Sequence, residues 1–143
     1  MQTKTILVVD DDRNFSRAFV KFCEGETVVT AGSIEDGIAL AQAITPGCIF
    51  LDVRFDGPWK TGIDAIAEFR AVTPDATIVV MSSMPNDYDR DRAMRLGASV
   101  YCAKTDLVRL NGVSSVLRAA HVANRRARRP IRSAAPSVAK KAR

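Results

Sequence analysis

Histidine and paired cysteines, the residues that build most protein metal cages, are almost absent from the sequence. His121 is the only histidine, and the three cysteines, Cys23, Cys48 and Cys102, stand far apart without a Cys-x-x-Cys pair. A zinc site with its usual ligands cannot be assembled from this set. An odd number of scattered cysteines instead predicts reduced, mostly buried thiols in a cytoplasmic protein.

Long apolar runs and glycine-rich phosphate loops are also missing. Strongly apolar runs are confined to residues 6–9, 48–51 and 78–81, far short of the roughly 20 residues that a bilayer requires, so we expect no membrane span. The start, MQTKTILVVDDD, lacks the pattern of a secretory signal because acidic residues end its apolar run. With no GxGxxG or GxxxxGKS-type motif and a single late histidine, an enzyme acting on small molecules is the function we least expect.

The positive charge of the chain is concentrated at its end. The 143 residues (15.6 kDa) carry a formal net charge of +5, but residues 123–143 hold eight bases and no acid. Residues 1–122 therefore carry 13 bases against 16 acids, a net charge of −3. We predict a globular domain over residues 1–122 and a basic, disordered tail over residues 123–143, whose small residues and two prolines cannot bury a core.

Short β-rich runs alternate along the domain with segments of helical spacing. The runs lie at residues 5–9, 27–30, 48–51, 77–81 and 99–103. They are apolar almost throughout rather than at alternate positions, which is typical of strands buried on both faces. Five strands alternating with five helices predict an α/β fold, a doubly wound five-stranded parallel sheet with helices on both faces.

Apolar spacing and capping signals define the expected helices. Ser33 is expected to cap the second helix, and Gly97 should follow the fourth, which spans about residues 86–96. The expected buried faces comprise Phe15, Phe19, Phe22 and Cys23 in the first helix, Ile34, Ile38 and Ala41 in the second, Ile63, Ile66, Ala67 and either Phe69 or Arg70 in the third, and Leu107, Leu110, either Val113 or Ser114, and Leu117 in the fifth.

Polar residues stand directly after the expected strands. They are Asp10, Asp11 and Asp12 after the first strand, Asp52 after the third, Ser82 and Ser83 after the fourth, and Lys104 after the fifth. Ligands of open parallel sheets bind outside the carboxyl ends of the strands. If the first and third strands are neighbours, at least three carboxylates should meet there, with one hydroxyl and one ammonium group nearby. Clustered carboxylates repel one another, and a hard divalent cation such as Mg²⁺ relieves that repulsion.

The same residues suffice for phosphoryl transfer to an aspartate. A carboxylate can act as the nucleophile and form an acyl phosphate. The transferred group has three peripheral oxygens that need neutralising, for which Mg²⁺, Lys104 and the Ser82 hydroxyl with a backbone N–H are available.

Four motifs, ILVVDDD, LDV, VVMSS and GASVYCAK, resemble in their order and spacing the receiver domain of bacterial two-component response regulators. The resemblance covers residues 4–122 and implies the flavodoxin-like strand order 2-1-3-4-5. It also implies that the phosphoryl donor is a phosphohistidine on a sensor histidine kinase or phosphotransfer protein. The domain would then be a regulator rather than an enzyme, beyond catalysing its own phosphorylation and dephosphorylation.

Residue by residue, the resemblance implies a metal and acceptor site and a switch. Asp52 would accept the phosphoryl group. Asp11 would bind Mg²⁺ directly, Asp10 directly or through water, and the backbone carbonyl of Arg54 would be a further ligand. Lys104 would contact a phosphoryl oxygen, Ser82 would turn toward the phosphoryl group, and Tyr101 would change rotamer with it. The face formed by the fourth helix, fifth strand and fifth helix would then bind a downstream protein or a second copy.

Two departures from the family pattern bear on the site. Thr105 follows Lys104, where the family usually has a proline after a cis peptide bond; either the loop holds a costly cis bond or it is trans and Lys104 shifts. The loop at residues 52–62 is about two residues longer than usual and contains Trp59, which either anchors a partner or packs on its own loop. Arg54 and Met84 stand at two positions where, in the family, the side chain tunes the access of water to the acceptor.

Purely structural roles stay open beside these functional ones. The Asp10, Asp11 and Asp12 cluster is also typical of a helix start, with Asp12 as the N-cap. Lys104 could be a solvated lysine, Ser83 could replace Ser82, and Tyr101 could be an ordinary sheet aromatic. The charged residues of the fourth helix are expected to form a solvated face.

Three functions follow from these observations. The first is a stand-alone, cytoplasmic response regulator that acts through protein contacts. The second is a degenerate receiver that binds its partner without phosphorylation, which Thr105 and the altered loop suggest. The third is a nucleic-acid accessory protein that uses the basic tail; because the tail has no aromatic residues to stack on bases, we do not expect sequence-specific recognition.

Overall fold

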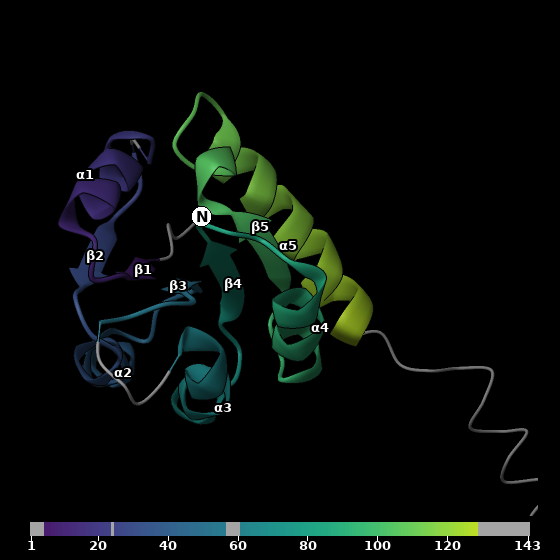
Figure 1. The fold of residues 1–143 in the computed structure, drawn as a ribbon. Coiled ribbons are helices and arrows are strands. Elements are labelled where there is room, and N and C mark those ends of the chain that lie inside the picture. Colours follow the sequence, from purple (N-terminus) through teal and green to yellow (C-terminus); the bar gives the residue numbers. More distant parts are fainter. Residues whose placement is uncertain (1–4, 24, 57–60, 129–143) are drawn as a thin grey trace, which may run out of the picture.

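The computed structural model describes residues 5–23, 25–56 and 61–128. Within them, strands and helices alternate along the chain (Figure 1). The strands are β1 (Ile6–Val9), β2 (Val28–Ala31), β3 (Cys48–Asp52), β4 (Thr77–Ser82) and β5 (Val100–Ala103). The helices are α1 (Arg13–Lys21), α2 (Ile34–Ile44), α3 (Gly62–Val72), α4 (Asp87–Arg95), a short 3₁₀ helix η1 (Lys104–Asp106) and α5 (Gly112–Arg128).

The strands form one parallel sheet in the order β2-β1-β3-β4-β5, which confirms the predicted doubly wound α/β fold and its strand order. Helices α2, α3 and α4 cover one face of the sheet, and α1 and α5 cover the other (Figure 1). The register places Asp52 beside Met81 and Ser82 beside Ala103, so the ends of β3, β4 and β5 meet at one edge.

Two apolar layers enclose the sheet, because successive side chains of a strand point to opposite faces. In β1, Leu7 and Val9 pack toward α2 and α3, whereas Ile6 and Val8 pack toward α1 and α5. The central strands β1, β3 and β4 are buried along their whole length, as their continuous apolar sequences predicted. The edge strand β2 is partly exposed.

Capping side chains place the helix starts where polar residues follow the strands. The carboxylate of Asp12 accepts hydrogen bonds from the N–H groups of Asn14 and Phe15, which confirms its prediction as the α1 cap. Ser33 caps α2 by accepting from the N–H of Asp36, and Gly97 follows α4 with a positive φ of 113°, both as predicted.

Three of the predicted buried positions are wrong. Phe22 is 42% exposed because α1 ends at Lys21, which turns the side chain away from the sheet. Leu110 is 83% exposed because the chain after β5 forms η1 and a turn before α5 begins at Gly112; Leu107, still buried, precedes the helix. Ala67 is exposed, and Ala65 takes the buried position in α3.

The three cysteines are free thiols, as predicted. Burial raises the pKa of Cys23 to about 11 and that of Cys102 to about 12, and it raises the pKa of Cys48 further. In the part of the chain that the structure describes, none of the helices combines the length and the apolar character that a membrane span requires. The predicted junction at residues 122 and 123 falls within α5, and the part of the tail after residue 128 lies outside the described residues.

Candidate functional site

Three carboxylates meet at the carboxyl edge of the sheet. Asp10 and Asp11 follow β1 directly, and Asp52 is the last residue of the neighbouring β3. One carboxylate oxygen from each lies within 4.8 Å of the others. Asp10 and Asp52 are only 2% and 5% exposed, whereas Asp11 is the more accessible of the three. Residues 41 positions apart in sequence are thus brought to one point by the pairing of two parallel strands.

Lys104 is the cation of this cluster. Its Nζ atom lies 2.7 Å from Asp10 Oδ2 and 3.4 Å from Asp52 Oδ1. The Lys104–Thr105 peptide bond is trans, since no described peptide bond is cis. The lysine nevertheless lies beside the acids rather than in solvent, with the η1 turn starting at Lys104 itself. The alternative of a solvated Lys104 therefore does not fit its contacts.

Main-chain N–H groups hold each carboxylate in place. Asp10 Oδ1 accepts from the N–H of Asp12 at 2.9 Å, and Asp52 Oδ1 accepts from the N–H of Val53 at 2.9 Å. Asp11 Oδ2 accepts from the N–H of Asp56 at 2.9 Å, which ties the start of the long loop after β3 to the end of β1. These bonds orient all three acids toward the shared edge of the sheet.

Burial and crowding change the ionisation of this cluster. The pKa of Asp52 is raised to about 7, chiefly because burial disfavours its charged form and also because Asp10 repels it; Lys104 acts in the opposite direction. Burial works against the charge of Lys104, but its hydrogen bond to Asp10 and the charges of both acids raise its pKa above the ordinary lysine value. The lysine thus stays charged while it offsets part of the repulsion between the acids.

The donor set fits a hard divalent cation. Three carboxylates face one ammonium group, which leaves negative charge in a partly buried place. Oxygen donors of this kind are the ligands that Mg²⁺ and Ca²⁺ prefer, and no nitrogen or sulfur ligand competes with them among the described residues. Arg54 lies two residues past Asp52. That its backbone carbonyl is a metal ligand stays a prediction.

Ser82 ends β4 next to this cluster. It is 4% exposed, and its Oγ atom accepts a hydrogen bond from the N–H of Met84 at 3.0 Å. Ser83 is exposed to solvent. The buried position at the strand end favours Ser82 over Ser83 as the hydroxyl of the site, and its role stays a prediction.

Tyr101 lies in β5 and connects the sheet to the start of α4. Its ring packs on the apolar layer beneath α2, α3 and α4, and its hydroxyl accepts from the N–H of Asn86, the α4 cap, at 3.2 Å. The guanidinium of Arg90 lies over the ring, 5.6 Å from its centroid. Arg92 pairs with Asp64 of α3 at 3.0 Å. Arg90 is exposed, as predicted for the charged face of α4, whereas Arg92 is half-buried where it pairs with α3.

Two contacts at the site were not anticipated from the sequence. The ring of Phe15 lies 4.7 Å from Lys104 Nζ, and Phe15 continues through Phe19 into the core. Gly62 starts α3 directly against the end of β3, where a side-chain carbon would lie 1.8 Å from the Asp52 carbonyl oxygen. A glycine after a loop is the one sequence signal that could have indicated this close approach. Trp59 and the rest of residues 57–60 lie outside the described residues.

Comparison with known proteins places the chain among regulators. It matches the family model of the response regulator receiver domain over residues 6–111. It is 32% identical over 103 residues to the photosynthetic apparatus regulatory protein RegA of Cereibacter sphaeroides, covering 71% of this chain and 55% of RegA. It is 35% identical over 104 residues to the acid tolerance regulatory protein ActR of Sinorhizobium medicae, covering 71% of this chain and 52% of ActR. The chain thus spans about half the length of the curated relatives it matches.

Solved structures show the same fold. A CheY-like receiver domain protein from Methanospirillum hungatei superposes with a TM-score of 0.75 at 17% identity, covering 87% of this chain and 99% of that one. A response regulator protein from Burkholderia pseudomallei, solved with a phosphorylated aspartic acid, calcium ion and citrate, has a TM-score of 0.67 at 24% identity. That match covers 80% of this chain and 72% of the other.

Proposed function

The chain belongs to the response regulator receiver domain family, and from this premise we propose that Asp52 accepts a phosphoryl group from a phosphohistidine on a sensor histidine kinase or phosphotransfer protein. The observation that carries the proposal is the convergence of Asp10, Asp11 and Asp52 beside Lys104. The Burkholderia pseudomallei regulator, which shares the fold, was solved with a phosphorylated aspartic acid, and this supports the same chemistry here.

The carboxylates of Asp10, Asp11 and Asp52 would hold Mg²⁺, with the Arg54 carbonyl as a further ligand. The ion would supply positive charge against the oxygens of the incoming phosphoryl group. The fit rests on the surplus of carboxylate over ammonium groups in the cluster and on its pure oxygen chemistry. The Burkholderia pseudomallei regulator was solved with a calcium ion as well, which agrees with a divalent cation in a protein of this fold.

Asp52 would act as the nucleophile. A bond forms between one of its carboxylate oxygens and phosphorus, while the bond from phosphorus to the donor's imidazole nitrogen breaks and the imidazole keeps that electron pair. Asp52 must be deprotonated to react, and burial has raised its pKa to about 7. Lys104 lowers that pKa and so keeps more of the reactive carboxylate near neutral pH.

Lys104 has a second task once the phosphoryl group is attached. Its Nζ atom already lies 3.4 Å from the acceptor, so it is within reach of a phosphoryl oxygen bonded to Asp52. Asp10 holds the ammonium group there through the shorter ion pair of 2.7 Å. We assign Asp10 and Lys104 to the positioning of charge around the acceptor.

The switch runs from Ser82 to the face formed by α4, β5 and α5. Ser82 would turn its hydroxyl from the N–H of Met84 toward the phosphoryl group, and Tyr101 would move with it. Because the Tyr101 hydroxyl accepts from the α4 cap and its ring lies under Arg90, a change of its rotamer would release both contacts. The altered face would bind a downstream protein or a second copy of this chain.

A degenerate, phosphorylation-independent receiver is the weaker alternative. Thr105 and the long loop suggest it, yet Lys104 contacts both Asp10 and Asp52 with Thr105 in place. The use of the basic tail on nucleic acid and the cytoplasmic location stay predictions, as does the division into residues 1–122 and 123–143.

Intact-mass measurement tests the proposal. The wild-type chain is incubated with acetyl phosphate and Mg²⁺ and should gain the mass of one phosphoryl group. Asp52→Asn should gain none, and Asp91→Asn, which removes an exposed carboxylate on α4, should behave as wild type. An unmodified wild type, or an equally modified Asp52→Asn, would overturn the proposal.

A further inference from the structure

Strand β2 has an open backbone edge. It lies at the end of the sheet, and no strand among the described residues pairs with its outer side. The carbonyls of Thr27 and Ala31 accept from the N–H groups of Ile6, the first residue of β1, and of Asp10, which directly follows β1. Because strand residues alternate in direction, the N–H and C=O groups of Val28 and Thr30 point away from β1. Such an edge can pair with one more strand.

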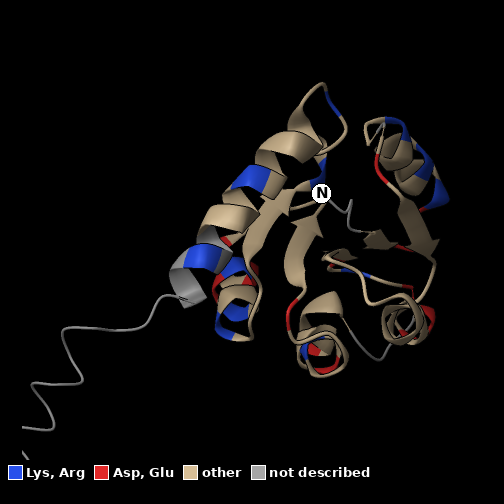
Figure 2. Ribbon diagram, turned by 180° about the vertical axis from the view of Figure 1, so that it is seen from behind, with Lys and Arg blue, Asp and Glu red and all other residues tan. Residues whose placement is uncertain are grey.

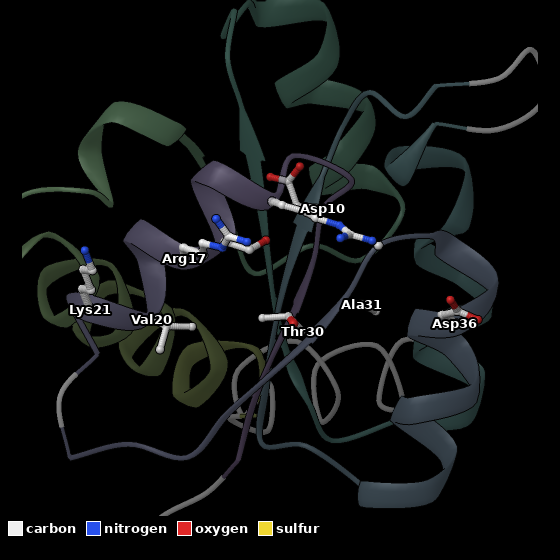
Figure 3. A pocket seen from close by; sticks show the side chains of 10 residues that line it. Asp10, Arg17, Val20, Lys21, Thr30, Ala31 and Asp36 are labelled. Carbon is white, nitrogen blue, oxygen red and sulfur yellow. The ribbon is translucent and has the colours of Figure 1, made fainter.

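A groove of about 720 Å³ lies at the carboxyl end of this edge, where Thr30, Ala31 and Gly32 line it, and it extends to Asp10 at the end of β1. Arg17, Val20 and Lys21 of α1 lie on one side of it, Thr30 of β2 lies at its floor, and Asp36 of α2 lies on the other side (Figure 3). The two helices cover opposite faces of the sheet, so the groove follows the sheet edge between them (Figure 1). A chain placed in it would reach the open side of β2.

The α1 side of the groove carries only positive charge. Arg13, Arg17 and Lys21 recur at every fourth position, and α1 contains no acidic residue (Figure 2). All three are exposed, and none forms an ion pair with a residue that the structure describes. Four helical residues span about 6 Å, and alternate residues of an extended strand are about 6.8 Å apart. Acidic side chains at alternate positions of a strand would therefore match these cations.

From the open edge and the row of cations we infer that this groove binds an extended acidic segment of another protein, which adds to the sheet beside β2. Its main chain pairs with Val28 and Thr30, and acidic side chains at alternate positions face Arg13, Arg17 and Lys21. A compact anion would contact only part of the row of cations, which is about 12 Å long, and would form no hydrogen bonds with the open backbone edge of β2. An extended polypeptide satisfies both features, as in other cases of strand addition.

Peptide binding to the full chain tests this inference. The probe is a synthetic peptide, acetyl-Thr-Glu-Val-Glu-Val-Glu-Thr-amide, titrated by calorimetry. The double variant Arg17→Glu, Lys21→Glu should weaken binding by about twofold to thirtyfold, since it removes two exposed ion pairs that contribute about 0.2–1 kcal/mol each. The matched variant Arg109→Glu, Arg118→Glu reverses two exposed cations elsewhere and should bind as wild type. No binding by the wild type, or equal binding by both variants, would overturn the inference.

A second experiment separates strand addition from charge alone. Two methylated peptides of the same sequence are used. The first carries N-methyl groups on the backbone amides of alternate residues, which blocks hydrogen bonding along one edge of the peptide strand. The other carries N-methyl groups on the remaining residues, which blocks the opposite edge. One of the two should lose binding, and the unmodified peptide should slow hydrogen exchange at the Val28 and Thr30 amides. Full binding by both methylated peptides, or displacement by inorganic phosphate at equal concentration, would show an anion site and overturn the inference.

Discussion

Lys104 is held more closely by Asp10 than by Asp52: its Nζ atom is 2.7 Å from Asp10 Oδ2 and 3.4 Å from Asp52 Oδ1. The ammonium group is therefore anchored on one carboxylate while it lies within reach of a group attached to the other. The proposed acceptor is left with an oxygen that is not committed to a tight ion pair, and this suits a nucleophile.

Removing the charge of Lys104 should raise the pKa of Asp52 above about 7, because the ammonium group is what lowers it. We expect this in Lys104→Met, measured by carbon NMR of the Asp52 carboxyl group across a pH titration. Phosphorylation by acetyl phosphate should become slower at neutral pH in the same variant. Lys21→Met, which removes an exposed charge on α1, is the control. An unchanged Asp52 titration in Lys104→Met would contradict the electrostatic account.

Asp52→Asn should stabilise the metal-free protein, and the gain should depend on pH. The pKa of Asp52 is about 7 in the folded chain, above the ordinary aspartate value near 3.9 of the unfolded chain. Between about pH 4 and pH 7 the folded state binds more protons than the unfolded state, so the free energy of unfolding falls as pH rises. The Asp52→Asn substitution removes the titrating group and therefore this fall in the free energy of unfolding.

Urea unfolding without divalent ions at pH 5 and pH 8 measures the effect. The advantage of Asp52→Asn over wild type should be larger at pH 8 than at pH 5 and should level off above about pH 7. Asp91→Asn should show no such trend. A gain that shrinks with rising pH would mean that the carboxylate of Asp52 is stabilised, not strained, by its surroundings.

Substitutions at Asp11 and Asp12 should have different effects, because we expect Asp11 to bind the metal whereas Asp12 caps a helix. Asp12→Ala should cost about 1 kcal/mol of stability, because the side chain caps α1, and should keep the response to Mg²⁺. Asp11→Ala should lose that response. In the wild type, Mg²⁺ at about 100 times its Kd should stabilise folding by about 2.7 kcal/mol. Thermal unfolding with and without Mg²⁺ gives both results, and an Asp11→Ala protein that responds like wild type would exclude Asp11 as a ligand.

Gly62 should tolerate no side chain. Its Cβ position lies 1.8 Å from the Asp52 carbonyl oxygen, a backbone atom that cannot move freely, so Gly62→Ala should destabilise the fold by about 1–3 kcal/mol or more. The matched control is Gly32→Ala, whose Cβ would have no atom within 4 Å. Chemical unfolding measures both. Equal stabilities of the two variants would show that α3 does not start against the end of β3.

The strands and the polar residues at their ends could be predicted because local signals determine them. Continuous apolar runs with polar residues at their ends identify central parallel strands, and the carboxyl ends of such strands share one edge. Asp10 and Asp52 stand at these ends, and they come together because the first and third strands are neighbours, a strand order that the family resemblance implied and no local signal carries. Gly97 and Ser33 marked helix boundaries through backbone and capping chemistry that acts within a few residues.

The remaining errors come from tertiary geometry that no local pattern carries. Leu107 and Leu110 have helical spacing, yet the 3₁₀ turn after β5 separates them from α5 and leaves Leu110 in solvent. The contact between Phe15 and Lys104 depends on how α1 lies against the end of β5. Arg92 reaches Asp64 only because α3 and α4 are neighbours on the sheet.

Reductive trapping of the acyl phosphate tests the central claim most directly. The chain is phosphorylated with acetyl phosphate and Mg²⁺, treated with borohydride, which converts a phosphorylated aspartate to homoserine, and mapped by peptide mass spectrometry. We predict homoserine at residue 52 and at no other aspartate, with no conversion when Mg²⁺ is withheld by chelation. Homoserine at residue 10 or 11, or none at any position, would contradict the assignment of Asp52 as the acceptor.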